Sequence, residues 1–185
     1  MKVKLFSIFI LFLLSCTSEY TPKPRAFSKI DLPNKIYEPI MVNCPFQFQK
    51  PNYSKVKLIN DNCFINLTFP NQNAILHITY FKLEDNLLEH TEESRRLAYK
   101  HNVMADAIIE KVYLDNNHNV YGVLYDYDGF TATAAQFYLT DSINHFFRGA
   151  LYFSTEVTDS LLPVNNFLKK DVIEIIESFR WKDLH

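Results

Sequence analysis

The second half of the chain alternates short apolar segments with connections too short to join parallel strands. Period-two alternation of apolar residues predicts strands, and a parallel crossover needs roughly a dozen residues or more. The polar run 115–119 and the dipeptide Asp128-Gly129 supply two tight turns. The segments must therefore pair as an antiparallel meander, with strands expected at 107–114, 120–127, 131–139 and 144–155.

Two further strands are expected at 64–69 and 74–83, where apolar residues again alternate. Upstream, prolines limit residues 30–32 and 36–42 to short extended pieces. This part of the chain is therefore also predicted to form β-strands.

Two helices complete the prediction. Residues 87–101 have helical spacing and contain neither Gly nor Pro. Apolar residues from Val164 to Phe179 form a broad helical stripe that begins beside Pro163. We predict an α+β fold, an antiparallel meander sheet packed by a middle helix and a C-terminal amphipathic helix.

The N-terminus has the pattern of a bacterial lipoprotein signal. Lys2 and Lys4 precede an apolar stretch of about ten residues, too short to span a bilayer. The small Ser15 then precedes Cys16, which predicts cleavage before the cysteine and acylation of its thiol. Two or more acyl chains anchor a protein stably. The alternative is an ordinary secretory signal with a chance cysteine.

These features divide the chain into three parts. We expect a signal peptide at 1–15, a lipidated N-terminus and extended tether at 16–26, and a single domain at 27–185. Pro22 and Pro24 favour a stiff, extended tether. Cleavage would leave a net charge of about −4, which argues against nucleic acid as a partner.

Cys44 and Cys63 remain after Cys16. Outside the cytoplasm, a pair with one possible connectivity favours a disulfide. Two buried free thiols are the alternative. A metal site is less favoured, because neither cysteine has a second cysteine or a histidine at ligand spacing.

The sequence contains no strong catalytic motif. The six histidines do not form a zinc-hydrolase pair, and three glycines leave no material for a phosphate-binding loop. We expect no metal, no cofactor and no enzymatic activity. An envelope hydrolase or a small-ligand binder, with a pocket between sheet and helices, is the alternative.

Several blocks of the chain resemble the GldD family of gliding-motility lipoproteins. They are Tyr-Thr-Pro-Lys-Pro-Arg at 20–25, Ile-Asp-Leu-Pro at 30–33, Cys-Pro-Phe at 44–46, Ser-Arg-Arg-Leu-Ala-Tyr-Lys-His at 94–101, Ala-Asp-Ala-Ile at 105–108, Thr-Asp-Ser at 140–142, His-Phe at 145–146 and Arg-Gly-Ala-Leu-Tyr-Phe at 148–153. The resemblance implies a membrane-anchored envelope protein needed for gliding motility and type IX secretion. The predicted sheet and final helix are also similar to Mog1/PsbP-like domains, an analogy that implies no function.

We expect the protein to act through contacts with other envelope proteins of this machinery. Arg and Tyr are favoured at interface centres, which suggests two groups of candidates. The first is on the middle helix and the second on the last hairpin; together they are Arg95, Arg96, Tyr99, His101, Asp141, His145 and Arg148. The alternative is an internal role, with Asp141 capping a turn and Arg148 paired with a carboxylate.

The expected location is the cell envelope, facing the periplasm. Residues 17–19 carry a single acid, so no strong acidic signal for surface display follows the lipid site. The outer membrane is the favoured site of the lipid anchor.

Overall fold

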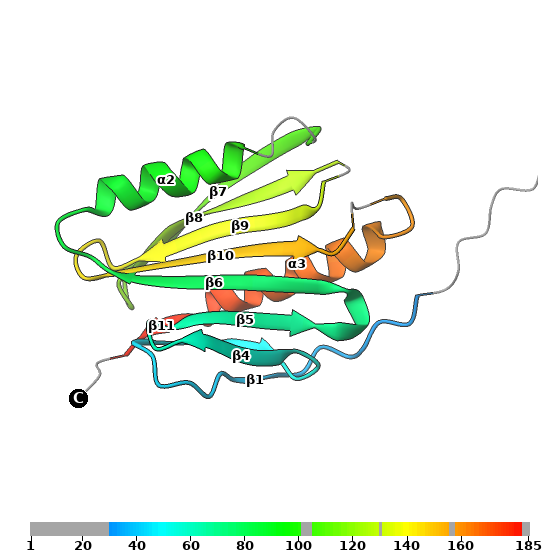
Figure 1. Ribbon diagram of the computed structural model, residues 1–185, viewed down its shortest axis with the longest axis horizontal. Coiled ribbons are helices and arrows are strands. Elements are labelled where there is room, and N and C mark those ends of the chain that lie inside the picture. The colour runs from blue at the N-terminus through cyan, green and yellow to red at the C-terminus, as the bar shows by residue number, and fades with distance from the viewer. Residues whose placement is uncertain (1–29, 101–104, 130, 156–157, 183–185) are drawn as a thin grey trace, which may run out of the picture.

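Seven antiparallel strands form one sheet, in the order β4-β5-β6-β10-β9-β8-β7 (Figure 1). The computed structural model describes residues 30–100, 105–129, 131–155 and 158–182. The strands of the sheet are β4 (Lys55–Asn60), β5 (Phe64–Phe69), β6 (Ala74–Lys82), β7 (Ala107–Asp115), β8 (Val120–Asp128), β9 (Thr133–Thr140) and β10 (His145–Phe153). A 3₁₀ turn at Pro70–Gln72 joins β5 to β6.

The sheet consists of two meanders that meet at its centre. β4, β5 and β6 form one, and β7 to β10 form the other. Their last strands pair along their whole lengths, so that Gly149 lies opposite Ile78. The predicted α+β class and antiparallel sheet are confirmed, whereas this central pairing joins segments that are about seventy residues apart and was not predicted.

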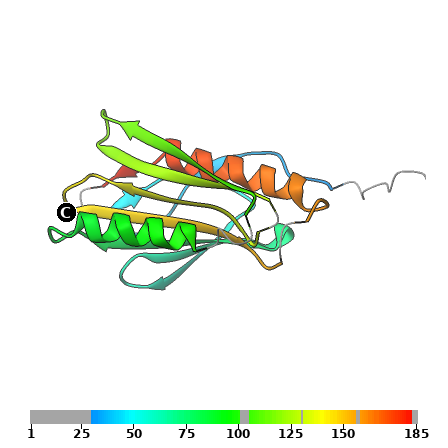
Figure 2. The same ribbon diagram turned by 90° about the horizontal axis from the view of Figure 1, so that it is seen from above.

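The two α-helices within the described residues cover opposite faces of the sheet. These are α2 (Leu87–Tyr99) and α3 (Leu162–Glu177), and Figure 2 shows the sheet lying between them. The start of α2 agrees with the prediction, while residue 101, its predicted end, lies outside the described residues.

The main core lies between the sheet and α3. Alternating strand residues point toward the helix, and Leu168, Val172 and Ile175 of α3 are buried against them. At the centre, the rings of Phe46, Phe147 and Phe179 pack with centroids 4.9 to 6.0 Å apart. Burying each such ring stabilises the fold by about 2 to 3 kcal/mol.

The helix α2 buries much less. Its buried side chains are Ser94 and Ala98, and the Ala98 carbonyl accepts a hydrogen bond from Tyr127 Oη at 2.7 Å. His90 stacks against Phe81 and Phe146, with centroids 4.8 and 5.2 Å away. The contact of α2 with the sheet is therefore largely aromatic and polar.

The N-terminal segment packs over α3 as short strands. β1 (Tyr37–Pro39) pairs with β3 (Gln49–Pro51), and β2 (Phe46–Gln47) pairs with β11 (Arg180–Trp181). A disulfide joins Cys44 to Cys63, whose Cα atoms are 5.8 Å apart, and so attaches this segment to β5.

Candidate protein-interaction surface

Several loops meet at one end of the sheet, which we call the loop end (Figure 1). It comprises residues 40–45, 61–63, 83–86, 116–119, 141–144 and 180–182. Backbone N–H groups hold these loops together: that of Leu83 donates to the Asn144 carbonyl at 2.7 Å, and that of Lys182 donates to the Pro45 carbonyl at 3.1 Å.

The described chain begins at the opposite end. Ile30 borders a surface hollow together with Asn71, Gln72 and Val164, beside the connection between β5 and β6. β6 runs from that connection to the loop end, and its nine residues span about 26 Å. The loop end is thus separated from Ile30 by the length of the sheet.

A groove of about 700 Å³ opens at the loop end. Its aromatic wall is Phe64, Tyr80 and Phe81, and its charged groups include Lys82 and Lys182. The complete lining is Asn43, Pro45, Asp61, Asn62, Cys63, Phe64, Tyr80, Phe81, Lys82, His145 and Lys182. With two lysines against a single acid, the groove favours an anionic or mixed polar and apolar ligand surface.

His145 stands at the edge of this groove at the start of β10. Its Nδ1 lies 2.7 Å from Tyr80 Oη, and its ring stacks on Trp181 with centroids 5.0 Å apart. Burial, followed by the nearby Asp141 carboxylate, raises the pKa of Tyr80. The pair of contacts fixes the imidazole between two aromatic side chains.

Asp141 shapes the adjoining turn. Its Oδ1 accepts backbone N–H groups from Ile143, Asn144 and His145 at 2.8 to 3.0 Å. Burial by itself would raise the pKa of Asp141, but these three donors outweigh it and lower that pKa. The geometry corresponds to the internal role considered above, because the carboxylate stabilises the turn that presents Ile143 and His145.

Exposed apolar side chains lie at or beside the loop end. Met41, Leu88 and Ile143 are 88, 75 and 72% exposed, and they come from three separate segments at or beside the loop end. A second hollow of about 330 Å³, which includes Met41, shares Asn43 and Lys182 with the groove. Apolar tips around a polar, aromatic groove are typical of a surface that contacts protein.

The predicted residues of the middle helix lie elsewhere. Arg96 makes two hydrogen bonds of 2.7 Å to Glu93, and Arg95 lies 5.7 Å from the centre of the Tyr99 ring. Tyr99 Oη donates to Glu110 Oε1 at 2.6 Å. These side chains occupy the solvent face of α2, and partner binding by them stays a prediction. His101, like Cys16, lies outside the described residues.

Arg148 is also separate from the loop end. It lies on the face of the sheet that α2 covers, and its Nη2 donates to Gln136 Oε1. The acceptor of this hydrogen bond is an amide, and the Glu93 carboxylate of α2 also interacts electrostatically with Arg148. Direct pairing of Arg148 with a carboxylate stays a prediction. Burial lowers the pKa of Arg148. Among the seven candidates, the structure therefore brings Asp141 and His145 together at the loop end, whereas Arg95, Arg96 and Tyr99 border a separate hollow on α2.

Several loop-end residues were missed in the sequence. Tyr80 and Trp181 are far from His145 along the chain, and only the pairing of β6 with β10 and of β2 with β11 brings them together. The single tryptophan of the chain was the one available signal. No group of three or more metal-binding side chains occurs in the described ranges.

A comparison with known families decides the relationship of this chain. The family model described as gliding motility lipoprotein GldD matches residues 17–181. The chain belongs to the GldD family. A search of curated proteins gives no match. GldD proteins are gliding-motility lipoproteins, and in the part of this member that the structure describes no helix has the length and hydropathy to cross a membrane.

Proposed function

We propose that this GldD-family chain is a lipid-anchored, non-enzymatic component of the gliding and type IX secretion apparatus, acting through protein contacts. Cys16 would carry the lipid, and residues 16–26 would tether the domain to the outer membrane on its periplasmic side. The lipid would be the only direct membrane contact, and no cofactor or nucleic acid takes part.

The observation that carries the proposal is the position of the groove. It opens at the loop end, whereas Ile30, the first described residue after the tether, lies at the other end of the sheet. A domain held from the Ile30 end would present the loop end away from its attachment. That orientation suits a surface that contacts other envelope proteins.

The chemistry of the loop end supports a protein partner. Tyr80, Trp181 and exposed Met41 belong to residue types that are enriched at interface cores. Lys82 and Lys182 at the groove would favour acidic groups on that partner. Aromatic side chains would supply binding energy to the protein contact, and the flanking lysines would make it specific for acidic surfaces.

The rival function, a hydrolase or ligand binder, was expected to use a pocket between sheet and helices. Aromatic rings from Phe46, Phe147 and Phe179 fill the space between the sheet and α3 in the described chain. A small-ligand site would instead have to use the surface groove, where a single histidine and a single acid lie among the lining residues.

The test compares gliding strains that differ only in this chain. Lys82→Glu with Lys182→Glu should abolish colony spreading and reduce cross-linking from a photoreactive residue at position 143, with protein levels unchanged. The matched control, Lys55→Glu with Lys57→Glu, makes the same charge change on exposed residues of β4 outside the groove. Normal spreading and normal cross-linking in the groove variant would contradict the proposal.

The same comparison tests the anchor. Cys16→Ala should release the chain from the membrane fraction and stop spreading while the folded domain, monitored by its Cys44–Cys63 disulfide, survives. Unchanged membrane fractionation and unchanged spreading would contradict the proposal that a lipid on Cys16 anchors the chain.

A further inference from the structure

The two edges of the sheet are built differently. β4 is six residues long, carries Lys55 and Lys57, and has a register shift between Leu58 and Asn60. Short length, lysines and bulges are the usual protection of an edge strand against pairing. The β4 edge is therefore blunted.

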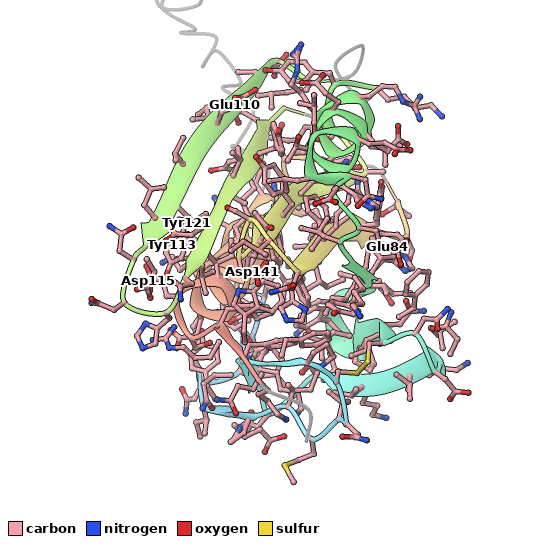
Figure 3. All side chains as sticks on the ribbon, turned by 90° about the vertical axis from the view of Figure 1, so that its left-hand side faces the viewer. Glu84, Glu110, Tyr113, Asp115, Tyr121 and Asp141 are labelled. Carbon is pink, nitrogen blue, oxygen red and sulfur yellow. A yellow bond between two sulfur atoms is a disulfide. The ribbon has the colours of Figure 1, made fainter. Side chains whose placement is uncertain are left out.

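The edge formed by β7 has little of this protection. It pairs with β8 in an unbroken register over nine residues, from Ala107 opposite Asp128 to Asp115 opposite Val120. In Figure 3, the labels for Glu110, Tyr113 and Asp115 follow this hairpin along the margin of the molecule. Among the described strands, none pairs with its outer side.

β7 also exposes apolar side chains on both of its faces. Ile109 is 50% exposed on one face, and Val112 and Leu114 are 71 and 69% exposed on the other. A long edge strand with a regular backbone and exposed apolar side chains is a ready template for pairing with another chain. The strand thus lacks a neighbour that its sequence favours.

We propose that β7 pairs antiparallel with β7 of a second copy of this chain, around a two-fold axis at Tyr113. In an antiparallel pair, the side chains of residues directly opposite each other lie on the same face of the sheet. With a two-fold axis perpendicular to the sheet, this holds only when one residue of the strand lies opposite its own copy across the axis. If the axis passes beside any one of residues 109 to 113, at least five residues of β7 pair with residues of the second copy.

Charge selects among these registers. An axis at Lys111 or Glu110 places like charges directly opposite each other, which is destabilising. An axis at Ile109 or Val112 places Glu110 opposite an apolar residue. Only the axis at Tyr113 places Lys111 opposite Asp115 and Val112 opposite Leu114, twice each by symmetry.

Both charged groups of this pair also have partners within the chain. Lys111 forms an ion pair with Asp126 at 2.8 Å and its side chain is 51% exposed, while Asp115 accepts from His118 Nδ1 at 2.8 Å and its side chain is 17% exposed. The contact across the axis would therefore be shared with these internal partners. The exposed surfaces of Val112 and Leu114 would cover each other across the axis. Five residue pairs make a small interface, so association should depend on concentration.

Cysteine cross-linking of the full chain in its own membranes tests the register. Tyr113→Cys should give a covalent dimer with a short bis-maleimide, because the two introduced thiols face each other across the axis. Ile109→Cys is the matched control: it lies on the same face and is exposed, but the proposed register separates its two copies by about 26 Å. The parent chain treated alike should give no covalent dimer, because Cys44 and Cys63 are joined in a disulfide.

A second measurement does not depend on an introduced thiol. Leu114→Lys should raise the dimer dissociation constant measured by sedimentation of the detergent-solubilised full chain at least tenfold, whereas Leu58→Lys on the blunted edge should leave it unchanged. Absence of a dimer in both experiments, cross-linking of Ile109→Cys in place of Tyr113→Cys, or capture of a different protein by Tyr113→Cys would each overturn the proposal.

Discussion

Asp171 is a buried charge on which three segments depend. It has no exposed surface, and its carboxylate accepts hydrogen bonds from Lys35 Nζ, from Tyr37 Oη at 2.8 Å and from Tyr53 Oη at 2.5 Å. Burial, together with the hydrogen bond to this carboxylate, raises the pKa of both tyrosines. The residue therefore holds the N-terminal segment onto α3.

Replacing this carboxylate should destabilise the domain. Asp171→Asn leaves Lys35 without its counter-charge and weakens both tyrosine hydrogen bonds, so unfolding should become easier by about 2 to 4 kcal/mol. Tyr53→Phe, which removes one donor, should cost about 1 kcal/mol and serves as the graded control. Urea denaturation monitored by tryptophan fluorescence measures both, and equal stability of Asp171→Asn and the parent would contradict this role.

For single residues, the sequence predicted local roles more reliably than contacts with distant residues. Asp141 was predicted to contact a partner, with a turn-capping role as the alternative, and its carboxylate accepts backbone N–H groups of the turn. Arg148 and Asp171 gave no comparable local signal. Their partners lie on other strands or segments, which only the folded chain brings close.

Among the elements, the N-terminal segment is the one most in need of a covalent attachment. Its strands β1, β2 and β3 are two or three residues long, so their backbone pairing contributes little by itself. The Cys44–Cys63 disulfide closes a loop with a sequence separation of 19 and fixes this segment beside the groove.

Removing the disulfide should lower the stability of the domain by about 3 kcal/mol, the chain-entropy value for a loop of this size. The paired variant Cys44→Ser with Cys63→Ser should show this loss in urea, and reduction of the parent chain should reproduce it. A reducing agent that leaves the parent unchanged while the disulfide is shown to be open would contradict the expectation.

The strands themselves differ in how visible they are in the sequence. β5 alternates strictly and β6, β8 and β10 alternate over part of their lengths, and all four were predicted close to their observed bounds. β4 was not predicted, although Lys55 and Lys57 alternate with Val56 and Leu58, and its lysines are typical of an edge strand. Its existence follows from pairing with β5.

The described residues include two buried tyrosines, Tyr125 and Tyr127, and several partly buried ones, and these set the response of stability to alkali. Burial, helped by neighbouring tyrosines and Glu110, raises the pKa of Tyr125 to about 12, and burial also raises the pKa of Tyr127 and Tyr53. In the unfolded chain a tyrosine loses its proton at about pH 10. The folded state therefore retains protons that the unfolded state loses.

Stability should accordingly be constant with respect to these tyrosines below about pH 10 and fall as pH rises toward 12 and above. Urea midpoints measured across this range check the trend, and tyrosinate absorbance should rise together with unfolding. Tyr125→Phe should flatten part of the slope. If the tyrosines ionise fully at about pH 10 while the chain stays folded, burial does not raise their pKa values and the prediction is contradicted.

The sequence by itself determined the fold class, the position of the helices and the pattern of the antiparallel strands, because these depend on local periodicity and on connections too short for any crossover. It also carried enough family-specific residues for the GldD relationship to be recognised. Only the tertiary structure decided that β6 lies beside β10, that Tyr80 and Trp181 enclose His145, and which edge of the sheet is left unprotected. These depend on contacts between residues far apart in the chain, for which local patterns contain no information.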